Sequence, residues 1–244
     1  MKRISAFELL AIRDSTLHLS VLEKSLYLLG VVYETDSAAM ADLSIGDRDT
    51  RLLKFREWIF GSRLINMAHC PTCNNVVEWE ANVDDILLKD LETNKDRKTY
   101  IHESEGYTIN FRLPNSYDII NATKIQNQSD DASAFISACI LNIENSNVEN
   151  PQSDLPQKIF QEISRQMSEA DPQAEISMVL NCPDCNNQWN APFNILNYLW
   201  LEIDNWAKHI LKEVVVLARH FGWSEKEILN LSFQRRQYYM EMIN

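Results

Sequence analysis

Two almost identical six-residue stretches, each with two cysteines, constrain this chain more than any other feature of its sequence. They are Cys70–Asn75 (CPTCNN) and Cys182–Asn187 (CPDCNN), and they contain four of the five cysteines. A C-x-x-C turn presents two sulfur atoms to one ion, and four thiolates complete a tetrahedral structural zinc site. We therefore predict one structural Zn²⁺ ion per chain, with the ligands Cys70, Cys73, Cys182 and Cys185.

The separation of the two cysteine pairs is unusual for such a site. Zinc ribbons usually place their pairs about 12–20 residues apart, whereas roughly 110 residues separate these two. The repeat also extends beyond the cysteines, because apolar residues occupy alternate positions after each pair, at Val77, Trp79 and Ala81 and at Trp189, Ala191 and Phe193. We interpret this as a split zinc ribbon of two strand–turn–strand copies. The ion would then hold the first and last thirds of the chain together, and its binding would add on the order of 10 kcal/mol to folding.

Other chemistry for these thiols stays open at this point. A redox-active pair of the thioredoxin type usually has a cysteine at a helix N-terminus, whereas strands are expected to flank both turns. An iron–sulfur cluster, a site that has lost its metal, and disulfides formed in an assembled particle are further alternatives. Cys139 lies among apolar residues and is expected to be a buried core thiol, and His69 is expected not to bind the ion.

Charge and motif content argue against several classes of function. The net charge is −12, with 35 acids against 23 bases, which makes nucleic-acid binding an unfavoured function. No apolar run reaches the roughly 18 residues of a membrane span. Glu8 comes too early for a secretory signal, so we expect synthesis in the reducing bacterial cytoplasm. No nucleophile, nucleotide-binding or metalloprotease motif is present, and we expect that the protein is not an enzyme.

The hydrophobic pattern predicts a helix-rich α+β fold. Expected helices are 5–30, a helix capped by Ser44 and ended by Gly61, then 115–124, 130–145, 155–169, 194–219 and 233–243. Strands are expected at 63–69, 77–83, 175–181 and 189–193, with a hairpin over 100–113. Residues 90–98 are predicted to form a loop, and 145–156 a flexible segment. Ser224 and Glu227 form a capping box at a further helix, with Trp223 and Ile228 as a hydrophobic staple.

These elements suggest four regions. They are an N-terminal helical region (1–61), a split zinc-ribbon β unit (62–90 and 174–195), an inserted hairpin with helices (91–173), and a C-terminal helical docking region (194–244) with a long helix and two shorter ones. Aromatic residues and arginine favour interface centres. On that basis we predict partner contact through the last two helices, at Trp223, Ile228, Leu229, Arg235, Arg236, Tyr238 and Tyr239.

Several segments together carry a resemblance to a known family. They are WIFG (58–61) before the first cysteine pair, YTINFRLP (107–114), the second cysteine pair with its long helix, FGWSEKEIL (221–229) and RRQYY (235–239). In these segments the chain resembles the zinc-knuckle baseplate proteins of contractile phage tails and phage-tail-like contractile injection systems. That family is related to phage baseplate hub and hub-assembly proteins.

The resemblance implies a structural or assembly role in the hub region of a baseplate, with other baseplate, hub or spike proteins as partners. It does not separate an assembly factor from a subunit that stays in the particle. The alternative from a different class is a zinc-ribbon adaptor that binds nucleic acid or acts in transcription. A thiol oxidoreductase is a third reading.

Overall fold

The structure is a computed structural model that describes residues 1–88, 99–125, 132–145 and 155–243. The chain forms two compact units. Unit 1 combines Met1–Ser37 with Ile195–Asn244, and unit 2 is Ala38–Asn194. Unit 2 is therefore inserted, in sequence, between the two segments that form unit 1. The finer division into four regions stays a prediction.

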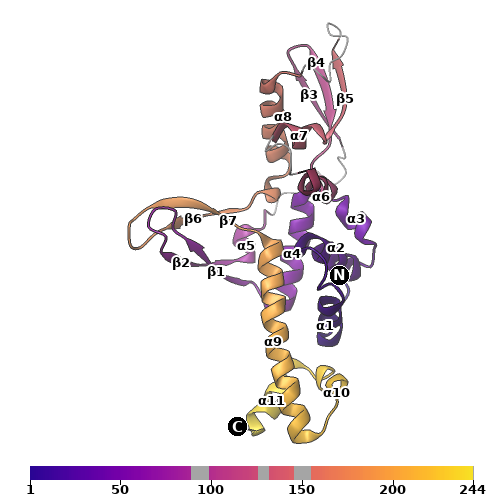
Figure 1. Ribbon diagram of the computed structural model, residues 1–244, viewed down its shortest axis with the longest axis vertical. Helices are drawn as coiled ribbons and strands as arrows, with labels where there is room; N and C mark the ends of the chain where they lie inside the picture. The colour runs from indigo at the N-terminus through magenta and orange to yellow at the C-terminus, as the bar shows by residue number, and fades with distance from the viewer. Residues whose placement is uncertain (89–98, 126–131, 146–154, 244) are drawn as a thin grey trace. The chain divides into compact units, whose positions relative to one another are not determined.

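Unit 1 is helical in the part of the chain that the structure describes. Its elements are α1 (Ala6–Ser15), α2 (Val21–Tyr33), α9 (Ile195–Phe221), α10 (Glu225–Leu229) and α11 (Phe233–Ile243). The long helix α9 contacts all four of the others, and α10 and α11 fold back beside its C-terminal end (Figure 1). The helix predicted over 194–219 and the final helix over 233–243 are confirmed.

One face of α9 forms the core of unit 1. Residues at spacings of three and four are buried along it, namely Leu199, Ile203, Ala207, Ile210, Val214 and Leu217. The first half of the helix also makes polar contacts. Trp200 donates from Nε1 to the Ser25 hydroxyl of α2 at 2.9 Å, and Arg13 of α1 pairs with Asp204 at 2.7 Å. Each buried polar group in these contacts therefore has a partner.

Capping boxes set where three helices of unit 1 begin. Ser5 with Glu8, Ser20 with Glu23, and Ser224 with Glu227 each make the reciprocal side-chain and backbone bonds. The box at Ser224 is confirmed as predicted. The single helical stretch predicted over 5–30 is wrong, because the chain forms two helices interrupted between Thr16 and Ser20.

Unit 2 contains the β-structure. Its first elements are α3 (Ser37–Ala41, which starts at the boundary), α4 (Ile45–Phe60), β1 (Arg63–His69), β2 (Val76–Asn82) and α5 (Val83–Ile86). Next come β3 (Tyr100–Ser104), β4 (Tyr107–Phe111), α6 (Ser116–Ile125), α7 (Ala132–Ser137), β5 (Ile140–Asn145) and α8 (Gln157–Ala170). The last are the 3₁₀ helix η2 (Pro172–Ala174), β6 (Ser177–Asn181) and β7 (Gln188–Pro192). The strands form one three-stranded and two two-stranded antiparallel sheets among the described residues.

The three-stranded sheet β3–β4–β5 has its own core. The hairpin closes with the two-residue turn Glu105–Gly106, whose φ values of 51° and 80° suit a tight hairpin. Ile109 and Phe111 of β4 are fully buried together with Ile159 and Ile163 of α8. The helix predicted over 130–145 is wrong in its second half. Residues 140–145 are instead strand β5, because they pair with β4.

The start of α4 joins several parts of unit 2. Ser44 caps the helix as predicted, and Gly61 ends it at φ 87°. The backbone N–H of Gly46 donates to Asp171, which follows α8, at 2.9 Å, and the Ile45 N–H donates to the Pro114 carbonyl at 3.1 Å. These bonds connect the first turn of α4 to both ends of the β3–β5 region.

Two predicted segments fall outside the described residues, wholly for the loop 90–98 and largely for the flexible segment 145–156. Among the helices of the described chain, none combines the length and the apolar character needed to cross a membrane.

Candidate metal centre

Two β-hairpins carry the four cysteines of the C-x-x-C pairs. Both are antiparallel, and the register places His69 opposite Val76 in β1–β2 and Asn181 opposite Gln188 in β6–β7. Each C-x-x-C turn therefore occupies the same position at the tip of its hairpin. The strands β2 and β6 lie next to each other, and Trp79 packs edge-on against Phe193 with ring centroids 5.8 Å apart. The hairpins thus pack together through the alternate apolar residues that follow the cysteines.

The two turns have the same backbone geometry. In the first, the Cys70 N–H donates to the Asn75 carbonyl at 2.9 Å and the Asn74 N–H donates to the Cys70 carbonyl at 2.8 Å. In the second, Cys182, Asn187 and Asn186 make the equivalent bonds at 2.9 and 3.0 Å. Asn74 and Asn186 have φ values of 62° and 56°, a left-handed conformation that asparagine tolerates. The repeated CNN sequence therefore encodes one turn twice.

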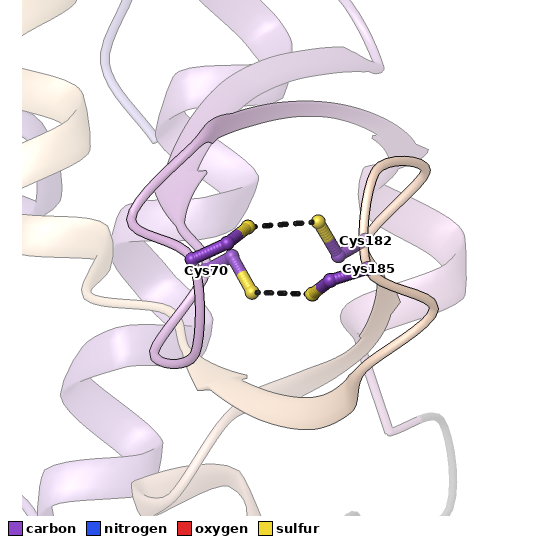
Figure 2. Close-up of side chains that lie close together, drawn as sticks. Cys70, Cys182 and Cys185 are labelled. Atoms are coloured by element: carbon purple, nitrogen blue, oxygen red, sulfur yellow. Dashed lines mark hydrogen bonds between the residues drawn. The ribbon is translucent and has the colours of Figure 1, made fainter.

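All four sulfur atoms converge between the turns. Cys70 Sγ lies 3.6 Å from Cys185 Sγ, and Cys73 Sγ lies 3.5 Å from Cys182 Sγ. All four ligand atoms lie within 4.8 Å of one another, and the cysteines are free thiols. Figure 2 shows the labelled Cys70, Cys182 and Cys185 pointing into the space between the two facing turns. In a tetrahedral site with Zn–S bonds of about 2.3 Å the sulfurs lie about 3.8 Å apart, so the donor set fits zinc.

The thiols shift one another's pKa values in opposite directions. Burial acts to raise the pKa of Cys70, but hydrogen bonds from the Cys73 and Thr72 N–H groups and from neighbouring thiols lower it to about 6. At Cys185 the Asn187 N–H acts to lower the pKa, whereas burial and hydrogen bonds with the other three thiols raise it to about 12. The thiolate form is therefore favoured at Cys70, and the protonated thiol at Cys73 and Cys185. A divalent cation among the sulfurs would favour the thiolate form of all four.

Side chains around the sulfurs hold the two turns together. Cys70 and Cys182 are 1% exposed and pack with Val77 and Trp189, whereas Cys185 is exposed. Asn75 donates to Asp184 of the opposite turn at 2.9 Å. Asn187 Nδ2 lies 4.0 Å from Cys70 Sγ, again across the turns. These contacts between the two turns were not predicted from the sequence. The repeated Asn-Asn pair after each second cysteine is the signal that could have indicated them.

Two other candidate ligands lie apart from this cluster. His69 Nδ1 contacts the Asn74 carbonyl at 3.3 Å, and the metal-ligand cluster contains no histidine. Cys139 is fully buried and lies near Arg112 and Asp118, and burial raises its pKa to about 12. It is the buried core thiol expected from the sequence.

The residues predicted for partner contact divide by exposure. Ile228, Leu229 and Arg236 are buried inside unit 1, where Arg236 pairs with Glu213 at 3.0 Å. Trp223 and Tyr239 are half-buried and pack against each other with ring centroids 4.8 Å apart. Only Arg235 and Tyr238 of the predicted set are exposed, Tyr238 to 63%. Partner contact stays a prediction, and the fold leaves these exposed residues as its candidates.

A family model described as T4 bacteriophage base plate protein matches residues 28–200. The chain belongs to this family. The matched segment includes both cysteine hairpins and the whole of unit 2. Comparison with curated proteins and with solved structures gives no significant match.

Membership of the baseplate family supports a structural role in a phage baseplate, with other baseplate proteins as partners. The structure adds the four-cysteine cluster of this baseplate protein, which can hold a metal ion. The fold class is confirmed as helix-rich with small antiparallel sheets.

Proposed function

We propose that Cys70, Cys73, Cys182 and Cys185 bind one structural Zn²⁺ ion. The observation that carries the proposal is the convergence of two copies of one turn, far apart in sequence, to place four sulfurs within 4.8 Å. Zinc in such a site supplies no catalysis. It ties two segments of the chain together, and its binding energy becomes folding energy.

The surroundings of the sulfurs support a closed structural site. Backbone N–H groups of Thr72, Cys73, Asn75 and Asn187 donate to the sulfurs, which tempers the charge of thiolates. Four protein ligands leave no open position for water or substrate. A redox-active thiol pair is less well supported, because both cysteine turns connect strands and neither lies at a helix N-terminus.

Elemental analysis of the purified chain tests the metal proposal. We expect one zinc per chain, and loss of the β-hairpin packing on chelation. Cys73→Ser should lose the metal, and proteolysis should then cleave both hairpins, because each depends on the other for a full ligand set. Cys139→Ala is the matched control and should retain zinc. Stoichiometric zinc in Cys73→Ser, or a metal-free chain with intact hairpins, would contradict the proposal.

We further propose that the protein acts in the hub region of the baseplate of a contractile phage tail or injection system, as a resident subunit or an assembly factor. Family membership supports the baseplate role, and the helical C-terminal region supports docking. The exposed Arg235 and Tyr238 lie next to an aromatic cluster of Phe221, Trp223 and Tyr239, and Arg235 donates to the Tyr239 hydroxyl at 3.4 Å. Partners would be hub or spike proteins, met in the bacterial cytoplasm during assembly.

Deletion of the gene, followed by electron microscopy of the tails, tests this role. We expect incomplete baseplates, and restoration when the chain is supplied from a plasmid. Mass spectrometry of purified particles then separates the two forms of the role, because a resident subunit is found in them and an assembly factor is not. Normal baseplates in the absence of the chain would refute the proposal. The excess of acid on the cysteine hairpins favours a protein partner over the nucleic-acid alternative.

A further inference from the structure

The outward face of the β1–β2 hairpin combines apolar and acidic side chains. The register places Ile65 opposite Glu80 and Met67 opposite Glu78, and all four residues are exposed. Residues directly opposite each other in such a pair have Cβ atoms about 5 Å apart. One strand therefore presents an apolar row and the other an acidic row, and exposed Val76 extends the apolar surface at the turn.

The opposite face of this hairpin is buried within the protein. Leu64, Val77, Trp79 and Ala81 point inward and are buried, as strand alternation requires. Met67 is 67% exposed, Val76 54% and Ile65 44%. Large apolar side chains gathered on one sheet face, rather than scattered singly, mark interaction sites. The outward face thus has the character of a docking surface.

Charge identifies the kind of partner that fits. Residues 62–88 and 175–194, which contain both cysteine hairpins, hold six acids and one base, a far greater excess of acid than in the chain as a whole. All six acids are exposed: Glu78, Glu80, Asp84, Asp85, Glu175 and Asp184. The one base, Arg63, already pairs with Glu80, with Nη2 2.8 Å from Oε2. A partner that brings positive charge is favoured here, and the phosphates of a nucleic acid are repelled.

We propose that the outward face formed by Ile65, Met67, Val76, Glu78 and Glu80 docks a segment of a protein partner that carries Lys or Arg beside apolar residues. The apolar row would accept the partner's apolar side chains, and the acidic row would pair with its cations. That the partner is another baseplate subunit rests on the proposed function. The charge and the apolar character of the segment rest only on this face.

Overlapping 15-residue peptides from the other baseplate proteins of the same phage provide the test. Their binding to the full zinc-loaded chain is measured by fluorescence anisotropy. We expect peptides with adjacent basic and apolar residues to bind, and to bind more weakly as salt rises, because the acidic row is exposed. The variant Met67→Lys/Glu78→Lys should bind them at least about tenfold more weakly. Ile101→Lys/Glu103→Lys, a matched change on the exposed face of β3, should bind them as the wild type does.

The proposal is overturned if no peptide binds, if acidic peptides or a DNA oligonucleotide bind equally well, or if Met67→Lys/Glu78→Lys binds like the wild type. Zinc content and circular dichroism establish that each variant is folded. If the double variant does not fold, Glu78→Gln/Glu80→Gln takes its place, and its binding should lose most of its salt dependence. The tail-assembly experiment is independent. Incomplete baseplates on deletion, without peptide binding, would overturn only this docking site and leave the baseplate role standing.

Discussion

Substitution of Gly46 by alanine tests the hydrogen bond that joins the start of α4 to Asp171 within unit 2. Gly46 lies in the first turn of α4, and its N–H donates to the buried Asp171 at 2.9 Å. A Cβ atom at this position would collide with Asp171 Oδ1, and it would lie 2.7 Å from Asp171 Cγ and 3.0 Å from the Ala174 nitrogen. The carboxylate must therefore move, and its bond to the helix N-terminus is lost.

The size of the effect follows from these contacts. A hydrogen bond to a charged group contributes about 1.5–3 kcal/mol, and overpacking costs about 1–3 kcal/mol. Alanine returns up to about 1 kcal/mol, because it favours the helix more than glycine does. We therefore expect Gly46→Ala to lower the free energy of unfolding by about 2–4 kcal/mol, as measured by urea denaturation followed through tryptophan fluorescence.

A double-mutant cycle makes the reasoning refutable. In the background Asp171→Ala the colliding carboxylate is absent, so Gly46→Ala should change stability by less than about 1 kcal/mol in either direction. Equal destabilisation in both backgrounds would show that the cost arises elsewhere. Burial raises the pKa of Asp171, while the Gly46 N–H lowers it. The stability that protonation of this carboxyl contributes is therefore lost as pH rises above 3.8. Gly46→Ala breaks the hydrogen bond that favours the charged carboxylate, so part of its destabilisation should be relieved at acidic pH, where Asp171 is protonated.

Two further predictions concern the ion pairs Arg112–Asp118 and Arg236–Glu213. Burial alone would raise the pKa of Asp118, but hydrogen bonds from Arg112 and the Asn115 N–H lower it below 3.8. Its stabilisation is present above pH 3.8 and lost as pH falls through the folded-state pKa, so Asp118→Asn should reduce this acid-dependent loss in unfolding measured across pH. In unit 1, Arg236→Ala should cost about 2–4 kcal/mol, because it leaves the partly buried Glu213 without its cation and with the Gln237 amide as its remaining hydrogen-bond donor among the described residues. Arg235→Ala, an exposed neighbour, should cost less than about 0.5 kcal/mol in the same thermal unfolding assay.

The sequence predicted the elements whose signals are local. The turns at Cys70 and Cys182 could be assigned because spacing and residue type encode them directly. Strand alternation placed β1 at its observed bounds and β2 one residue too late, because Val83 begins α5 and does not extend the strand. The cap at Ser224 was recognised. The equivalent boxes at Ser5 and Ser20 were missed, because continuous apolar spacing suggested one helix across them.

Strand pairing and side-chain contacts between residues far apart in the sequence could not be predicted from local patterns. Residues 130–145 have helical spacing, yet Ile143 lies opposite Ile109 because the backbone of β4 needs a hydrogen-bonding partner. Likewise, spacing indicated that the four cysteines meet, but not that Cys70 lies beside Cys185 or that Asn75 contacts Asp184. Those pairs follow from how the hairpins pack. Ile228 and Leu229 illustrate a third limit, because an apolar helix face looks the same whether its own chain or a partner covers it.

The discontinuity of unit 1 has a consequence for how the protein is made. Helices α1 and α2 leave the ribosome about 160 residues before α9, the helix on which they pack. At 5–20 residues per second this delay is roughly ten to thirty seconds. During that interval leucines that end fully buried, such as Leu28 and Leu29, have no native cover from α9. The inserted unit can therefore complete its fold before unit 1 does, and α1 and α2 wait for the last part of the chain to cover them.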